Sequence, residues 1–309
     1  MKNKASGAVD LVVVGSVALD TIETPFTRKD DLLGGSVSYA CAAASFFTRT
    51  GMVGIVGDDF PAAYKALYAS FGIDLAGLQT AKGKTFRWSG VYENDMINRR
   101  TLRTDLNVFA RFTPVLPAAY RSAPFFLLGN ISPELQLHVL AQAEKPRFVA
   151  ADTMDLWIGT AREPLMRLIR QVNMLLLNDS EARMLTDEHN LKRCARMILT
   201  WGPDYVVIKK GEHGALLASR SGIFLVPAYP VDVVRDPTGA GDAFAGAFMG
   251  SLAGRRQVRE NDVRQALFAG SVVASFGVEG FGLDRMSSLR RREIGARLRE
   301  LRKMTVVRW

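Results

Sequence analysis

Residues 231–250, VDVVRDPTGAGDAFAGAFMG, constrain the fold more than any other part of this chain. The apolar segment at 231–234 is expected to be a strand, and the small residues that follow position 241 are typical of a buried helix. Between them, Gly239, Ala240 and Gly241 form a tight turn whose backbone can approach a ligand closely. Because the first N–H groups of a helix are unpaired and carry partial positive charge, this stretch predicts an anion site in an α/β fold.

Asp242 adds a negative charge in the first turn of the predicted helix. A site that only binds phosphate gains nothing from this carboxylate, whereas a site that deprotonates a hydroxyl beside a migrating phosphoryl group needs a base there. The N–H groups of Gly239, Ala240 and Gly241 would then stabilise charge on the phosphoryl oxygens. The alternative is that Asp242 only caps the helix. We favour the first interpretation, which is that of a small-molecule kinase.

Two other nucleotide-binding motifs do not fit the same stretch. Phe244 occupies the third glycine position of a GxGxxG dinucleotide motif, where its bulk would block close packing of the helix on the strand. The chain also contains neither GxxxxGKS nor GxxxxGKT, which excludes a Walker-type phosphate loop.

The composition narrows the class of protein. With 309 residues, 48% of them hydrophobic, the chain is long enough for one large α/β domain, which we expect to span residues 1–309. No apolar run reaches membrane-spanning length and residues 1–10 are polar, so we expect a soluble, cytoplasmic protein. Cys41 and Cys194 are expected to be buried, reduced thiols. The three histidines are too few to favour a histidine metal centre or a catalytic triad.

The chain carries a net charge of +9, from 40 lysines and arginines against 31 acidic residues. Many of the basic residues gather near the C-terminal end, and no aromatic residues alternate with them. We therefore interpret this run as the solvated face of a helix, and expect neither nucleic acid nor membrane as a partner. Its members are Arg290, Arg291, Arg292, Arg297, Arg299, Arg302, Lys303 and Arg308.

Continuous apolar strands alternate with helical segments, a pattern typical of a parallel sheet covered on both faces. The predicted strands are residues 11–15, 52–56, 125–128, 148–151, 174–177 and 205–208, and the predicted helices are residues 37–47, 61–71, 133–143, 158–170, 180–185 and 191–200. Residues 84–104 instead place a polar turn between two strand-like runs, which predicts a hairpin. Together with residues 21–33 it would form a small accessory sheet.

The run DPTGAGDAF at 236–244 resembles the C-terminal signature of the ribokinase-like (PfkB) carbohydrate kinases, and further matches run from Val12 to about Gly282. The resemblance implies a three-layer α/β/α fold with a mostly parallel central sheet and a small β lid, here about residues 20–33 and 84–110. It implies ATP and Mg²⁺ as cofactors, with K⁺ as a further candidate, and a homodimer formed through the lid. It also gives Asp242 and the glycine turn the roles stated above.

The same resemblance points to a magnesium site. Asn178 and Glu181, in the run NDSE after a predicted strand, match the NxxE motif that organises Mg²⁺ and phosphate largely through water. Taken alone, this pair is also an ordinary cap at a helix start. Asp236 and Thr238 match positions that help to bind a monovalent cation, and Thr238 is assigned to the cofactor site.

The run KKGEHG at 209–214 resembles the family's nucleotide-contact turn TxGxxG, with Lys209 where threonine is usual. Gly211 and Gly214 are expected to let the backbone approach the nucleotide. Lys209 and Lys210 either screen phosphate charge or are solvated turn residues, and the residue pattern alone favours solvation.

Asp20 follows the strand LVVVG, and a carboxylate at this end of a parallel sheet points into the crevice where such sheets bind ligands. In the resembling family this position holds sugar hydroxyls, and Gly34 and Gly35 resemble the family's substrate turn. Tyr39 stands where the family often has asparagine. Further residues expected at the substrate or beside the crevice are Ser38, Tyr39, Arg87, Trp88 and Asp152. Trp157 could also flank the crevice, although a tryptophan in this position is more often part of the core.

These observations predict an ATP-dependent kinase that phosphorylates a hydroxyl of a small molecule, with a sugar favoured as the acceptor. A nucleoside is the alternative, which the aromatic residues Trp88, Tyr39 and Phe86 favour. A non-catalytic ligand sensor on the same scaffold is a third hypothesis. The intact Asp242 and glycine turn argue against it, because a sensor does not require a base.

Overall fold

The strand LVVV lies at the centre of the fold, and all four of its side chains are buried, as a strand covered on both faces requires. In the computed structural model, which describes residues 8–255 and 257–307, β1 (Leu11–Val14) pairs in parallel with β4 (Thr50–Gly57) and β8 (Phe125–Leu128). The described part of this sheet has nine strands in the order β13-β12-β11-β10-β9-β8-β1-β4-β5. The remaining strands are β5 (Asp74–Ala81), β9 (Phe148–Asp152), β10 (Met174–Asn178), β11 (Tyr205–Lys209), β12 (Ala215–Ser219) and β13 (Gly222–Val226).

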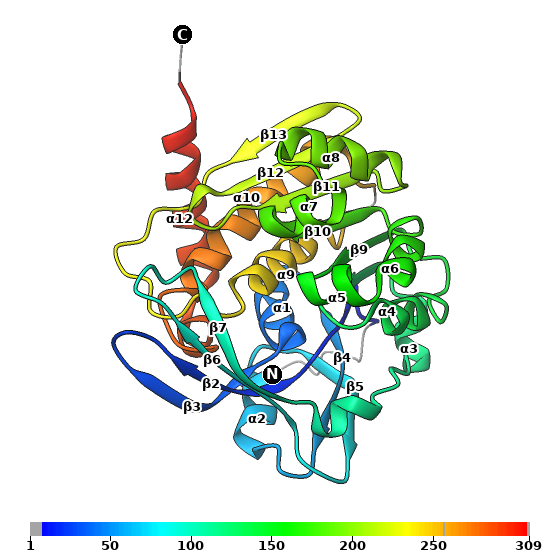
Figure 1. Cartoon of the computed structure of the whole chain (residues 1–309), viewed down its shortest axis with the longest axis vertical. Helices are drawn as coiled ribbons and strands as arrows, with labels where there is room; N and C mark the ends of the chain where they lie inside the picture. The colour runs from blue at the N-terminus through cyan, green and yellow to red at the C-terminus, as the bar shows by residue number, and fades with distance from the viewer. Residues whose placement is uncertain (1–7, 256, 308–309) are drawn as a thin grey trace, which may run out of the picture.

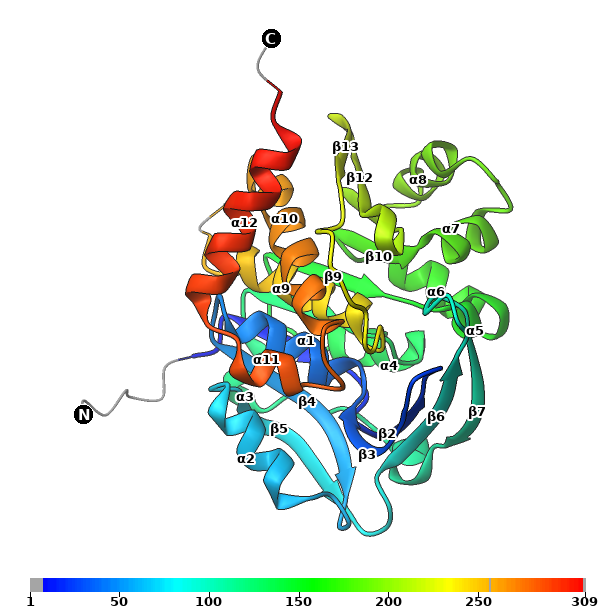
Figure 2. The same ribbon diagram turned by 90° about the vertical axis from the view of Figure 1, so that its left-hand side faces the viewer.

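Neighbouring strands from β11 to β5 in this order run parallel, and β12 and β13 add an antiparallel edge. Helices cover both faces, as the side view in Figure 2 shows. One face carries α1 (Ser36–Ser45), α2 (Ala62–Ser70), α9 (Ala240–Leu252), α10 (Glu260–Gly277), α11 (Asp284–Ser288) and α12 (Arg291–Thr305). The other carries α4 (Pro133–Leu140), α5 (Asp155–Thr160), α6 (Arg162–Ile169), α7 (Asp179–Thr186) and α8 (Leu191–Thr200). Short helices in the connections are α3 (Ala118–Arg121), η1 (Asn107–Arg111) and η2 (Gly211–His213).

Alternation along β1 divides the apolar residues between two cores. Leu11 and Val13 belong to the core beneath α1, α9 and α10, whereas Val12 and Val14 belong to the core beneath α4, α6 and α7. Successive side chains of a strand point to opposite faces, so a run of four apolar residues is needed to supply both cores. The expected three-layer α/β/α fold with a mostly parallel sheet is confirmed.

A separate small sheet lies beside the carboxyl ends of the central strands (Figure 1). Its described strands have the order β3-β2-β6-β7, and they are β2 (Ala18–Glu23), β3 (Arg28–Gly34), β6 (Phe86–Tyr92) and β7 (Arg99–Asp105). β6 and β7 form the hairpin that the sequence predicts, and β2 joins β6 in parallel. We call these four strands the lid.

Two predicted elements are wrong in detail. Residues 231–234 are not a strand: Val233 is 58% exposed, and the next N–H groups, of Arg235 and Asp236, donate to the Val278 carbonyl rather than to a neighbouring strand. The single helix predicted at 158–170 is two helices, α5 and α6, which meet at Ala161. Pro164 explains the break, because it has no N–H to donate to the Thr160 carbonyl four residues earlier.

The basic run near the C-terminal end lies mostly on the exposed side of α12, as expected. Arg297 is the exception, since its guanidinium lies 3.5 Å from the centre of the Phe276 ring and pairs with Glu279 at 2.8 Å. Arg308 and residues 1–7 lie outside the described residues. Cys41 and Cys194 are both buried. No helix in the described part of the chain has the length and apolar composition that a membrane span needs.

Helices α1 and α9 pack unusually close together because both are built from small residues. A Cβ atom added to Gly246 would lie 2.1 Å from the Ala40 carbonyl oxygen, and one added to Gly250 would lie 2.8 Å from the Ala44 Cα. Backbone therefore contacts backbone along this pair of helices. The contact also brings the amino-terminal ends of α1 and α9 to the same edge of the sheet.

Gly246→Ala should lower the free energy of unfolding by about 1–3 kcal/mol, because the added methyl group can be accommodated only if one helix moves. Denaturant titration of both proteins measures the difference. Gly159→Ala in α5 is the matched control, since its added Cβ would lie 3.5 Å from the Met184 Cε, an ordinary contact, and alanine favours a helix by up to about 1 kcal/mol. Equal stability of the two alanine variants would contradict the close approach.

Candidate active site

Three neighbouring strands of the central sheet end in polar residues at the same edge. Asp152 ends β9, Asn178 ends β10 and Lys209 ends β11, and the register pairs Asn178 directly with Lys209. The amino-terminal ends of α1 and α9 face this edge. Parallel sheets bind ligands outside the carboxyl ends of their strands, so this edge is the candidate active site.

The glycine turn before α9 has a clear steric explanation. Gly239 has φ +72°, and a Cβ atom there would lie 2.2 Å from the Tyr39 ring. A Cβ atom on Gly241 would lie 3.3 Å from the Lys209 Nζ. The Ala240 N–H closes the turn by donating to the Pro237 carbonyl at 3.2 Å, whereas the N–H groups of Gly239 and Gly241 have no acceptor among the described residues. Two of the three predicted donors are therefore free to meet an anion.

Asp242 lies in the first turn of α9 and is half-buried. Loss of hydration, together with the negative charge of Asp152, raises the pKa of Asp242 to about 7, and the positive charges of Lys209 and Arg99 oppose this rise. A general base works best when its pKa is near the working pH. The environment of Asp242 therefore suits proton abstraction at neutral pH.

Asp20 and Tyr39 have buried polar atoms that face the site without protein partners. Asp20 is 4% exposed, and burial together with the charges of Asp236 and Asp242 raises its pKa to about 8. Its Oδ1 and the Tyr39 hydroxyl make no hydrogen bond among the described residues. Buried polar atoms are nearly always paired in folded proteins, so these two atoms indicate the place of a polar ligand. A side chain at Gly34 would collide with the Asp20 carboxylate, because its Cβ would lie 1.8 Å from Oδ2.

Asp236 and Thr238 hold the glycine turn in place. Asp236 accepts hydrogen bonds from the Thr238 N–H at 2.9 Å and from the Gly282 N–H at 3.2 Å, which ties the turn to the loop after α10. The Thr238 hydroxyl pairs with the Tyr92 hydroxyl at 3.0 Å, which ties the turn to the lid. Burial raises the pKa of Asp236.

Asn178 and Glu181 form the helix cap that the sequence allows. The Asn178 Oδ1 accepts from the Glu181 N–H at 2.8 Å, and the Glu181 Oε2 accepts from the Asn178 N–H at 2.6 Å. Burial raises the pKa of Glu181 to about 7, and the charge of Lys209 opposes this rise. The charge of Lys209, whose Nζ lies beside Gly241, acts on Glu181, and the oxygens of Asn178 and Glu181 are of the type that Mg²⁺ prefers, so the donor set fits a magnesium ion bound largely through water.

Two predicted site residues have other partners. The Ser38 hydroxyl bonds the Gly34 carbonyl and the Tyr68 hydroxyl, both at 2.6 Å, in a fully buried position, so it does not reach a substrate. Arg87 is not free as a lid contact, because it pairs with Asp31 and, at 3.4 Å, with the Asp59 Oδ2.

The glycines of the predicted nucleotide-contact turn differ from each other. Gly214 is required because a Cβ atom there would lie 2.0 Å from the Val226 carbonyl oxygen, so its close approach is to its own sheet rather than to a nucleotide. Gly211 has φ +54° and open space around it. Gly211 therefore remains the candidate for contact with a nucleotide.

The structure adds Arg99, which sequence reasoning missed, and gives Lys209 and Trp157 partners that the sequence did not predict. Arg99, on β7, places its guanidinium 5.6 Å from the centre of the Trp88 ring and lowers the pKa of both Asp20 and Asp242. Lys209 is not a solvated turn residue, because its Nζ pairs with the Asp152 Oδ2 at 2.7 Å. Trp157 donates its indole N–H to the Asn130 Oδ1 at 2.9 Å beside the crevice. Position on the hairpin was the only sequence signal for Arg99.

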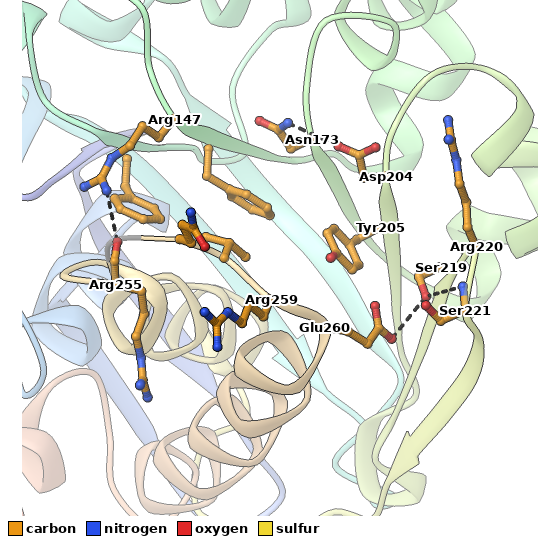
Figure 3. Close-up of a pocket in the computed structure, with 14 residues that line it drawn as sticks. Arg147, Asn173, Asp204, Tyr205, Ser219, Arg220, Ser221, Arg255, Arg259 and Glu260 are labelled. Carbon is orange, nitrogen blue, oxygen red and sulfur yellow. Dashed lines mark hydrogen bonds between the residues drawn. The ribbon is translucent and has the colours of Figure 1, made fainter.

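A groove of about 540 Å³ lies at the opposite, amino-terminal edge of the sheet, where Tyr205 begins β11 (Figure 3). Its polar groups bond one another: Asn173 donates to Asp204, and Ser219 donates to Glu260. None of the predicted site residues lines this groove. It is therefore separate from the candidate active site.

Comparison with known proteins agrees with this geometry. Residues 10–288 match the family model described as pfkB family carbohydrate kinase, so the chain belongs to that family. A cytidine kinase of Thermococcus kodakarensis is 32% identical over 259 residues, which cover 82% of this chain and 91% of that protein.

Solved structures share the fold. The nucleoside kinase of Burkholderia thailandensis in complex with inosine has a TM-score of 0.74 at 20% identity, and the match covers 94% of this chain and 96% of that one. A putative ribokinase II of E. coli in complex with ATP and Mg²⁺ has a TM-score of 0.73 at 16% identity, covering 94% and 99%. The family defines the chain as a phosphotransferase that acts on a hydroxyl of a sugar or nucleoside, with ATP as the phosphoryl donor that its kinases use.

Asp242→Asn should make the ligand-free protein more stable at pH 8. Because the folded state raises the pKa of Asp242 from 3.8 to about 7, the folded protein loses stability as the pH rises from about 4 through 7. An asparagine cannot ionise and avoids this loss, which amounts to about 1–3 kcal/mol because the half-buried carboxylate keeps part of its hydration. Thermal unfolding at pH 5 and pH 8 measures the difference, which should be larger at pH 8. A variant less stable than the wild type at pH 8 would contradict the raised pKa.

Proposed function

We propose that the acceptor is a nucleoside, and that the protein phosphorylates a hydroxyl of its ribose. Asp20 would hold ribose hydroxyls, and Asp242 would take the proton of the hydroxyl that attacks the γ-phosphorus of ATP. As the new O–P bond forms, the bond from phosphorus to the β–γ bridging oxygen breaks, and ADP leaves with that electron pair. The free N–H groups of Gly239 and Gly241 would stabilise the charge on the phosphoryl oxygens.

Magnesium fits beside Asn178 and Glu181, where it would neutralise phosphate charge when bound. The lid would exclude water from the transfer, and the Tyr92–Thr238 hydrogen bond supports this by joining lid and turn.

The observation that carries the choice of a nucleoside is the position of Trp88. The register pairs Trp88 on β6 with Asp20 on β2, so the two side chains leave the lid on the same face. The indole lies along β6 over Gly90, where an added Cβ would be 2.2 Å from the Trp88 ring. Such a flat aromatic surface suits stacking of a base, which contributes about 1–3 kcal/mol per base. Likeness to a cytidine kinase supports the same choice.

A free sugar is the second candidate, and the buried, unpaired Asp20 Oδ1 is the observation that favours it, because this atom needs only a hydroxyl donor. Release of ADP, measured with cytidine, uridine, adenosine, inosine, ribose and deoxyribose, distinguishes the two acceptors. Turnover with ribose but with none of the nucleosides would refute the proposal. Absence of turnover with every acceptor would favour the sensor hypothesis.

Asp242→Asn should lower kcat with the best acceptor by about 10³-fold or more, while ATP binding persists, because only the base is lost. In the wild type, kcat/KM for the acceptor should rise as the pH increases from 6 to 8, since kcat/KM reports the free enzyme, in which the pKa of Asp242 is about 7. Initial rates over this range and calorimetric titration with ATP measure both effects. Turnover within tenfold of the wild type would contradict the role of Asp242.

Trp88→Ala should raise KM for the nucleoside about tenfold or more, because it removes the stacking surface. KM for ribose, which has no base to stack, should change little. Steady-state kinetics with both acceptors measure the two constants. Equal changes for both acceptors would show that Trp88 shapes the lid without contacting a base.

Three further expectations stay predictions: a monovalent cation beside Asp236, a homodimer through the lid, and a cytoplasmic location. Exposed apolar side chains of the lid region, such as Phe26 at 79% and Ile97 at 63%, support the dimer.

A further inference from the structure

Lys209 and Asp152 form an ion pair in the interior of the site. The Lys209 Nζ lies 2.7 Å from the Asp152 Oδ2, and the two side chains are only 17% and 5% exposed. β10 lies between their strands, so the lysine side chain reaches across the end of β10 to meet Asp152. Its direction is thus fixed along the carboxyl-terminal edge of the sheet.

The ammonium of Lys209 lies against the glycine turn. Its Nζ is 3.3 Å from the position that a Cβ atom of Gly241 would occupy, closer than nine in ten ordinary contacts of a Cβ atom. Gly241 provides one of the two free N–H groups at the start of α9, and Asp242 follows it. The ammonium, the free N–H groups and the proposed base therefore surround one small region.

The charges around Lys209 argue against a purely structural role. The carboxylates of Asp152, Glu181 and Asp242 all raise the pKa of Lys209, although burial lowers it. A buried ion pair is weak evidence for stability, because the cost of desolvating both charges offsets much of their attraction. This region holds the ammonium of Lys209 among three carboxylates, with the charge of Arg99 close enough to lower the pKa of Asp242. A triphosphate entering it needs a positive charge that is already in place.

We propose that Lys209 is a catalytic residue whose ammonium contacts a non-bridging oxygen of the phosphoryl group during transfer, and that Asp152 is a positioning residue that holds it there. This inference rests on the proposed function and adds a side-chain cation to the backbone donors. Lys209 keeps its protons throughout, since the acceptor proton goes to Asp242. A positioned cation of this kind contributes on the order of 10²–10⁵ to the rate of phosphoryl transfer.

The test compares Lys209→Met, Lys209→Arg and Asp152→Asn with the wild type. Lys209→Met keeps most of the side-chain volume and removes the charge, and it should lower kcat about 100-fold or more with a much smaller change in the acceptor KM. Lys209→Arg should recover part of this loss, because it restores the charge. Asp152→Asn should lower kcat by about tenfold, again with little change in the acceptor KM. Lys192→Met, which removes a positive charge from the exposed surface of α8, is the control and should be unchanged.

A binding measurement separates this inference from the proposed function. Calorimetric titration with Mg²⁺ and either ADP or the non-hydrolysable ATP analogue AMP-PCP requires no acceptor. Lys209→Met should weaken AMP-PCP binding about tenfold and ADP binding less than threefold, because only AMP-PCP carries the γ-phosphoryl group. If no acceptor turns over in the wild type, the proposed function fails, whereas this difference still supports the contact with Lys209.

The inference is overturned if Lys209→Met retains kcat within threefold of the wild type, or if ADP and AMP-PCP binding weaken equally. Either result would mean that Lys209 only neutralises Asp152. Lys209→Gln replaces Lys209→Met if the methionine variant does not unfold cooperatively, and the same limits apply to it.

Discussion

The close contact between α1 and α9 is the constraint on which the site depends. Gly246 and Gly250 let the α9 backbone touch α1, so the ends of both helices reach the same edge of the sheet. Tyr39, near the start of α1, then presses its ring on Gly239, at the start of α9. The turn at Gly34 and Gly35 and the glycine turn before α9 are thus held together by the close packing of α1 on α9. Tightly packed small residues allow little movement of α1 relative to α9. This rigidity suits two reacting groups that must meet within a few tenths of an ångström.

Local sequence was sufficient to predict the central sheet and the glycine turn. Four consecutive apolar residues in β1 can be buried only between two layers, and the glycines before a small-residue segment predict a tight turn at a helix start. The strand predicted at 231–234 failed for a non-local reason. Whether an apolar segment joins a sheet depends on a free edge beside it, and here the following N–H groups bond the loop after α10 instead.

The side-chain roles were less predictable because they depend on contacts between distant segments. Ser38 lies next to a predicted substrate turn, yet its hydroxyl points inward to Tyr68, 30 residues along the chain. Lys209 looked like an exposed turn lysine, yet Asp152, 57 residues earlier, draws it into the site. Arg99 lies on a polar hairpin strand in which every residue but the last is exposed, and only the folded lid brings its charge to Asp20 and Asp242.

The raised pKa values of the buried carboxylates imply that their protonation changes when substrates bind. Asp20, Asp242 and Glu181 have pKa values raised to about 8, 7 and 7 because burial disfavours their charged forms, so near neutral pH the ligand-free site holds protons on part of this set. A base is useful only in its charged form. Magnesium and the acceptor hydroxyls would supply the positive charge and hydrogen-bond donors that the protein lacks, and would draw protons off these carboxylates. Substrate binding and activation of Asp242 are then one linked equilibrium, which would favour proton abstraction when both substrates are in place.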